Sequence, residues 1–253
     1  MDSNYPPAPW DDEGYPLKCK LAGVGGGIIA VIAILYLFVA CMVGSIFTTK
    51  MTSMAAADLQ ICIKAADFAA KKHRDQRRKG PDKAPYINHP IGVANILANE
   101  GGIDDPIVLQ AALLHDTVED TETSLDEIEQ EFGKIVRDVV DEVTDQKDLP
   151  SKERKRLQVI NAPKKSPRAK LVKLADKLYN LRDLNQSPPA DWTEERIQQY
   201  FVWSSYVLHG VKGTNEALET KIDEVLGARG VKMSPPPENY QGYDKSGETN
   251  PYA

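Results

Sequence analysis

One apolar pattern repeats through residues 55–230 and determines the class of fold. Apolar side chains recur there at spacings of three and four residues, as at Leu59, Ile63 and Ala66, which is the period of an amphipathic helix. Convincing period-two alternation, which is typical of half-buried strands, does not occur in this sequence. The stretch therefore predicts an all-α bundle, with helices over 55–79, 90–99, 106–114, 124–132, 134–145, 151–161, 166–184, 193–209 and 214–226.

Local signals mark the ends of several of these helices. Gly80 ends the first one, because glycine favours helix termination. Asp105 is followed by Pro106, which combines an N-cap with a proline in the first turn. Ser124 is followed three residues later by Glu127, the pattern of a capping box. These signals agree with the helical period.

The segments outside the bundle differ sharply in composition. Residues 1–20 are rich in proline, tyrosine and acidic residues and are predicted to be disordered. Residues 21–47 carry no charge and would span about 40 Å as a helix, so they predict a single transmembrane helix. A cleaved signal peptide fits less well, because the preceding region is long and acidic. Residues 52–232 form the predicted helical domain, and the proline-rich stretch 233–253 is predicted to be a disordered tail.

Charge and cysteine content limit the function classes. The formal net charge of -6 argues against a general nucleic-acid binder, which usually presents a basic face. The three cysteines are scattered and form neither a disulfide framework nor a zinc-binding pattern. The helical domain is therefore expected in a reducing, cytoplasmic environment, with membrane anchoring only through residues 21–47.

Four residues form a candidate metal site. His89 lies in INHP, the pair His115 and Asp116 lies in AALLHDTVED, and Asp176 lies in KLVKLADKLYNLRDL. A strongly apolar helix ends at the His-Asp pair, and burying these groups there is costly unless a cation compensates them. Imidazole nitrogens and carboxylate oxygens together suit Mn²⁺, Fe²⁺ or Zn²⁺.

Two further carboxylates follow the pair. Glu119 and Asp120 lie three and four residues after Asp116, so a continuing helical turn would place all three on one side. Carboxylates that are near a metal but not needed as ligands can orient and deprotonate a water. Asn180 lies one turn after Asp176, where its amide could meet a ligand bound at the metal.

Ordinary explanations exist for each of these residues taken singly. His89 could cap the next helix, and Asp176 could pair with Lys173 or Lys177 on its own helix. The basic run 71–79 is typical of a solvated helix face. Arg78 and Lys79 nevertheless stand at its end, ten residues before His89, where they could stack on a base or bind phosphate.

Two other histidines are interpreted as lying outside the site. His73 falls in the very polar stretch KKHRDQRRK and could be exposed at the surface or lie behind the residues of the site. His209 stands near a helix C-terminus, where a partly positive imidazole is favourable anyway.

The three stretches HRDQRRKGPDKAPYINHPIGVANIL, LQAALLHDTVEDT and KLVKLADKLYNLRDL together resemble the hydrolase domain of RelA/SpoT proteins. The resemblance is greatest to the stand-alone animal members of that family and covers about residues 55–230. It implies an all-α HD-domain fold and a manganese-dependent hydrolase that converts ppGpp to GDP and pyrophosphate. The animal members are also linked to removal of the 2′-phosphate of NADPH.

The resemblance also assigns roles to residues of this chain. The metal ligands would be His89, His115, Asp116 and Asp176, with Mn²⁺ as the cofactor. Glu119 and Asp120 would activate the attacking water. Base, ribose or phosphate groups would be held by Arg78, Lys79 and Asn180, and the 5′-phosphate end by Arg196 and Tyr200.

Two features depart from the family pattern. The family has a lysine directly after a Leu-Pro step, whereas this chain has Ser151 and then Lys152, which could weaken one phosphate contact. The apolar segment 21–47 and both tails fall outside the resemblance. Two alternatives stay open: another HD-domain phosphohydrolase acting on dNTPs, nucleoside monophosphates or cyclic nucleotides, and a non-catalytic, membrane-tethered nucleotide-binding module.

Overall fold

Helices account for the regular structure from residue 56 to residue 242, the part of the chain that the computed structural model describes. Within that range the only extended pairing is an isolated bridge between Arg77 and Pro85. The all-α prediction is therefore confirmed. After a first helix over 56–72, the elements are α2 (Asn88–Asn95), the π-helical η1 (Ile96–Glu100), α3 (Pro106–Leu114), α4 (Thr117–Asp120), α5 (Leu125–Phe132), α6 (Lys134–Val143), α7 (Ser151–Asn161), the 3₁₀ turn η2 (Ala162–Lys164), α8 (Pro167–Gln186), α9 (Glu194–Gly210) and α10 (Glu216–Gly227).

The capping signals in the sequence are present as hydrogen bonds. The Asp105 side chain accepts from the backbone N–H of Ile107, and Pro106 is the first residue of α3. The Ser124 hydroxyl accepts from the backbone N–H of Glu127 and caps α5, which begins at Leu125. Both N-caps are confirmed, but the capping box at Ser124 is only half present, because the Glu127 carboxylate pairs with Lys72.

The first helix is shorter than the period predicted. It ends at residue 72 rather than 79, because the following run has no apolar side chains to bury and the backbone turns over 73–75. The chain then runs back on itself, with the N–H of Arg78 bonded to the carbonyl of Ala84. The side chain of Gln76 donates to the carbonyl of Asp120 and ties this segment to α4. The turn directs Arg78 toward the interior instead of along a helix surface.

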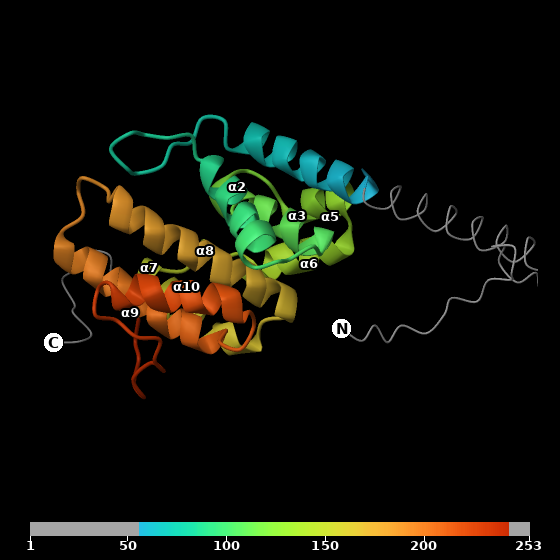
Figure 1. The fold of residues 1–253 in the computed structure, drawn as a ribbon. Helices are drawn as coiled ribbons and strands as arrows, with labels where there is room; N and C mark the ends of the chain where they lie inside the picture. The colour runs from blue at the N-terminus through green and yellow to red at the C-terminus, as the bar shows by residue number, and fades with distance from the viewer. Residues whose placement is uncertain (1–55, 243–253) are drawn as a thin grey trace, which may run out of the picture. The chain divides into compact units, whose positions relative to one another are not determined.

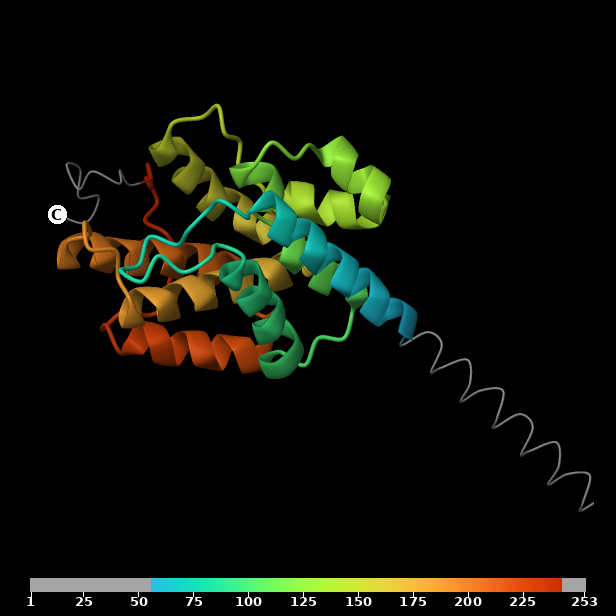
Figure 2. The same cartoon turned by 90° about the horizontal axis from the view of Figure 1, so that it is seen from above.

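The long helix α8 lies in the centre of the fold. It packs against α2, α3 and α6 on one side and against α9 and α10 on the other (Figures 1 and 2). Leu174, Leu178 and Leu181 are fully buried along it. A helix enclosed on several sides can hold polar groups only where other buried groups compensate them, so its polar residues mark the site.

The predicted disordered segment 1–20 and the predicted transmembrane helix 21–47 lie outside the described residues. None of the helices between residues 56 and 242 combines the length and apolar composition that crossing a bilayer requires. The predicted C-terminal tail, 233–253, is described as far as Gly242. Within it, Tyr240 is buried and its ring lies 5.5 Å from that of Tyr206 in α9, so the prediction of disorder is wrong for the part of the tail that packs on the helices.

Close packing between α2 and α8 gives a prediction about stability. A methyl group at Gly92 would lie 2.1 Å from the Tyr179 ring, so Gly92→Ala should lower the free energy of unfolding by about 1–3 kcal/mol. Gly227→Ala is the matched control, since a Cβ there meets nothing within 4 Å. It should be neutral or stabilise by up to ~1 kcal/mol. Urea unfolding measures both, and equal effects would contradict this view of the α2–α8 contact.

Candidate active site

Three helices bring the predicted metal ligands to one buried point. His89 lies in the first turn of α2, His115 and Asp116 follow the end of α3, and Asp176 lies in the middle of α8. The Nε2 atoms of His89 and His115 are 3.2 Å apart. Asp116 Oδ2 lies 3.4 Å and 3.2 Å from these two nitrogens, and Asp176 Oδ1 lies 3.4 Å and 3.9 Å from them. The four residues therefore converge.

This donor set fits a divalent cation. His89, His115 and Asp176 offer ligand atoms that all lie within 4.8 Å of one another. Atoms bound at about 2.1 Å to a common ion are about 3.0–3.4 Å apart, close to the observed separations. Nδ1 of His115 donates to the carbonyl of Ala112 at 2.7 Å, which leaves the Nε2 lone pair directed at the cluster. Nitrogen and oxygen donors of this kind suit first-row metals.

The electrostatics of the cluster also favour a positive charge there. Burial lowers the pKa of His115, but the carboxylates of Asp116 and Asp176 outweigh that effect and raise it to about 9. Burial raises the pKa of Asp116, yet the adjacent His115 and His89 hold it well below its usual range. The two aspartates thus stay ionised and stabilise a cation between the rings.

Glu119 and Asp120 project into the same cavity as Asp116 from the short helix α4. Burial, followed by the nearby charge of Asp145, raises the pKa of Glu119 to about 7. Glu119 accepts from Arg154 Nη1 at 3.2 Å and from the backbone N–H of Asp145 at 3.3 Å. A carboxyl group with this pKa can accept a proton near neutral pH.

A tyrosine connects Asp120 to the cluster. The Tyr86 hydroxyl lies 2.8 Å from Asp116 Oδ2 and 3.0 Å from Asp120 Oδ2. The Tyr86 ring packs on His73, which is buried although its polar sequence context gave no sign of this. His73 was interpreted as lying outside the site, and the structure places it directly behind Tyr86.

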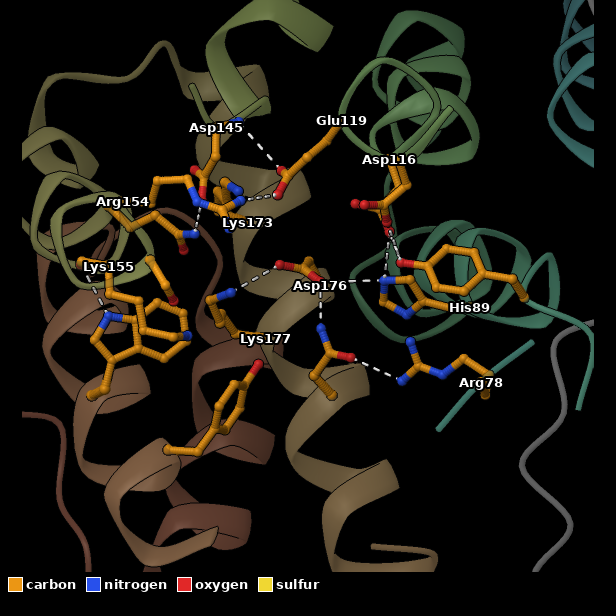
Figure 3. Close-up of a pocket in the computed structure, with 17 residues that line it drawn as sticks. Arg78, His89, Asp116, Glu119, Asp145, Arg154, Lys155, Lys173, Asp176 and Lys177 are labelled. Carbon is orange, nitrogen blue, oxygen red and sulfur yellow. Dashed lines mark hydrogen bonds and ion pairs between the residues drawn. The ribbon is translucent and has the colours of Figure 1, made fainter. Parts of the chain in front are cut away.

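A cavity of about 250 Å³ contains these groups (Figure 3). Of the predicted site residues, those lining it are Arg78, His89, Asp116, Glu119, Asp120, Asp176, Asn180 and Tyr200. A second cavity of about 300 Å³ adjoins it, because Arg78, Tyr86, Asp120, Asn180 and Tyr200 line both.

The predicted substrate-binding residues differ in their distance from the two cavities. Arg78 lies near the rings of Tyr86 and Tyr179, with its Cζ 5.7 Å and 5.6 Å from their centres. Lys79 is exposed at the rim of the second cavity. Arg196 lies 4.3 Å above the Trp192 ring and lines neither of these two cavities.

The sequence did not identify the basic residues at the far end of the first cavity. Arg154, Lys155, Lys173 and Lys177 line it beside Trp203. The three lysines are only 8%, 6% and 4% exposed, so they are not the solvated helix residues that such a pattern usually indicates. Of the alternatives for Asp176, the pair with Lys177 exists, at 3.1 Å. His89 does not cap α2, since it lies within that helix.

An all-helical domain that gathers His and Asp ligands in this way has the characteristics of an HD-domain protein. Residues 65–202 match the sequence profile of the HD domain family.

Relatives define the group more narrowly. The human guanosine-3′,5′-bis(diphosphate) 3′-pyrophosphohydrolase MESH1 is 63% identical over 171 residues, covering 68% of this chain and 96% of that protein. Its Xenopus tropicalis counterpart is 59% identical over 178 residues, covering 70% and 99%. A solved structure described as a metazoan ortholog of SpoT that hydrolyzes ppGpp is 53% identical, with a TM-score of 0.67 over 68% of this chain and 96% of that one. The chain belongs to the HD-domain family, within the group of MESH1 proteins.

The cluster gives a prediction about metal binding. A first-row divalent ion at ~100 times its Kd should stabilise the metal-stripped protein by about 2.7 kcal/mol, seen as a rise in Tm. His115→Ala and Asp176→Asn should abolish this rise, because each removes a donor from the cluster. His209→Ala is the control, since His209 lies in the last turn of α9 and lines neither cavity. A normal rise in His115→Ala would show that the ion binds elsewhere.

Proposed function

We propose that this chain is a metal-dependent hydrolase that removes the 3′-pyrophosphate of ppGpp. The main support is the buried cluster of two histidines and two aspartates beside the acidic pair Glu119 and Asp120. The relatives named above carry this activity in their names, and this chain spans nearly their full length. The reaction adds water to ppGpp and yields GDP and pyrophosphate.

The charge of the cavity fits such a substrate. Its lining includes five acidic and five basic side chains, Asp116, Glu119, Asp120, Asp145 and Asp176 against Arg78, Arg154, Lys155, Lys173 and Lys177. Because these formal charges cancel, a bound divalent cation leaves the cavity positive overall. A positive cavity attracts a polyphosphate and disfavours neutral substrates.

In the proposed mechanism, His89, His115, Asp116 and Asp176 hold Mn²⁺. When bound, such an ion polarises the scissile phosphate and lowers the pKa of an adjacent water. Glu119 accepts the proton of the attacking water, and Asp120, held by the Tyr86 hydroxyl, orients that water. The water oxygen bonds to the phosphorus next to the ribose 3′ oxygen, and the bond between that phosphorus and the 3′ oxygen breaks. The proton taken from the water passes to the departing 3′ oxygen, so that GDP leaves with a 3′ hydroxyl and pyrophosphate is released.

The second cavity is proposed to hold the nucleoside. Arg78 lines this cavity, and its guanidinium, fixed beside the rings of Tyr86 and Tyr179, is proposed to contact the base. Asn180 and Tyr200 line both cavities and can contact the ribose between base and phosphate. Lys79 at the rim, and Arg196 after a change of its side-chain rotamer, are proposed to bind the 5′-phosphates.

The proposed domain organisation follows the sequence. Residues 52–232 are the catalytic domain, residues 21–47 anchor it to a membrane, and 1–20 and 233–253 are flanking tails. The domain expressed alone, as 52–232, would hydrolyse the substrate, and parallel assays with ppGpp and NADPH would rank the two substrates. A panel of dNTPs, nucleoside monophosphates and cyclic nucleotides separates this function from other HD-domain phosphohydrolases. Binding without turnover would indicate a non-catalytic module.

The proton-accepting role of Glu119 gives a prediction. Glu119→Gln keeps the shape of the side chain but removes its basicity, so kcat for ppGpp should fall by about 100- to 10,000-fold. Metal binding, measured by calorimetry, should stay unchanged. Glu122→Gln is the matched control, because Glu122 is exposed and lines neither cavity. Parental turnover in Glu119→Gln would remove Glu119 from the mechanism.

Ser151 gives a second prediction. Its hydroxyl lies in the cavity wall, buried and without a hydrogen-bond partner among the described residues, while the neighbouring Lys152 is exposed and outside the lining. A lysine at position 151 would add a cation facing the substrate phosphates. Ser151→Lys should therefore lower KM for ppGpp by roughly 2- to 10-fold. Lys152→Ala should leave KM for ppGpp unchanged. If Lys152→Ala instead raises KM by as large a factor as Ser151→Lys lowers it, Lys152 already makes this phosphate contact.

A further inference from the structure

Lys173 is a buried cation without an ionic partner at contact distance. It is 6% exposed, lies on α8 and lines the first cavity. Within residues 56–242 it forms neither a side-chain hydrogen bond nor an ion pair, although its charge acts at longer range on Glu119 and Asp176. Burying an ammonium group is costly unless a negative charge compensates it, so this position favours an anion in the cavity.

The neighbours of Lys173 reinforce this preference. Lys177 lies one turn further along α8, buried, with its Nζ 3.1 Å from Asp176 Oδ2. Like charges four residues apart on a helix repel each other, which makes two buried lysines here unfavourable without an anion. Arg154 of α7 also lines the cavity, and its Nε is buried without a hydrogen-bond partner among the described residues.

Asp176 separates this basic end from the metal cluster. Its Oδ1 lies near the histidine nitrogens, and its Oδ2 faces Lys177. Figure 3 shows Lys173, Lys177 and Arg154 on one side of Asp176, and His89 and Arg78 on the other. An anion that reaches both sides must carry charge on two adjacent groups, as a diphosphate does.

We propose that Lys173, with Lys177 and Arg154, forms a subsite for the terminal phosphate of the 3′-diphosphate and for the pyrophosphate product. This subsite rests on the proposed function, in which the metal cluster holds the phosphate next to the ribose and the basic residues hold the terminal phosphate. The ammonium groups of Lys173 and Lys177 and the guanidinium of Arg154 donate to the phosphate oxygens. They make the cavity selective for a diphosphate over a single phosphate at the 3′ position.

The test compares product inhibition in the metal-loaded full chain. In Lys173→Met, the inhibition constant of pyrophosphate should rise by about 10- to 100-fold, the loss expected for one charged hydrogen bond. The inhibition constant of GDP should stay unchanged, since GDP contacts the nucleoside side. Lys173→Arg should restore most of the pyrophosphate inhibition.

Lys170→Met is the matched control, because Lys170 lies one turn earlier on α8, lines neither cavity and should keep the parental constants. If Lys173→Met does not fold, Lys173→Gln serves the same comparison, with the Tm of each variant measured beside its kinetics.

The outcomes separate this proposal from the proposed function. If the parental chain hydrolyses ppGpp and Lys173→Met is inhibited by pyrophosphate as strongly as the parental chain, the subsite is wrong and the function stands. Equal weakening of pyrophosphate and GDP would likewise overturn it, because this indicates a general structural effect. If the parental chain does not hydrolyse ppGpp, calorimetry with pyrophosphate replaces inhibition, and selective loss in Lys173→Met supports the subsite while the function fails.

Discussion

The gathering of four polar side chains at the junction of α2, α3 and α8 is the constraint on which the structure depends. Two imidazole nitrogens face each other at 3.2 Å, with two ionised carboxylates beside them; both rings and Asp176 are buried, and the Asp116 side chain is 16% exposed. Such a group is favourable only when a cation offsets its desolvation. A metal ion bound there would therefore contribute to the free energy of folding as well as to catalysis. It would also hold the three helices that carry its ligands in register.

The central position of α8 follows from the same constraint. Residues at positions 173, 176, 177 and 180 share one face of the helix, and that face lines the cavity. The remaining faces carry leucines and valines into the core, such as Val172 and Leu178. This one helix thus supplies a metal ligand, two lysines and an amide to the cavity. It can do so because side chains three or four residues apart on a helix point to the same side.

Local chemistry explains which features the sequence could predict. The caps at Asp105 and Ser124 depend on neighbours within three residues, and both were predicted. The ends of α7 were predicted in full, since Pro150 precedes it and an Ala-Pro step follows. The first helix was predicted seven residues too long, because the polar run after residue 72 has no apolar side chains to bury as a helix and instead bonds to distant segments, Gln76 to Asp120 and Arg78 to Asp183.

The basic end of the cavity could not be predicted for a related reason. Lys155 and Lys173 lie in amphipathic patterns where lysine is usually solvated, and only the packing of α7, α8 and α9 around Trp203 buries them. Burial of His73 is equally non-local, since it depends on the Tyr86 ring. The His-Asp pair was recognisable because it directly follows an apolar helix, so that its burial could be read from adjacent residues.

The two cavities are joined by a continuous chain of hydrogen bonds, which bears on how the site can discriminate among nucleotides. Arg78 Nη2 donates to Asn180 Oδ1 at 3.0 Å, and Asn180 Nδ2 donates to Asp176 Oδ1 at 2.6 Å. Asn180 therefore uses its oxygen toward the guanidinium proposed to contact the base and its nitrogen toward the metal cluster. The same Arg78 nitrogen is held by Asp183 at 2.6 Å, so the guanidinium is fixed before any ligand arrives. A guanidinium fixed in this way loses little entropy when a base binds to it. A base bound in the wrong position would disturb the hydrogen bond from Arg78 to Asn180, and Asn180 in turn bonds to Asp176 of the metal cluster. Under the proposed function, nucleoside recognition and phosphate chemistry are coupled through this one amide.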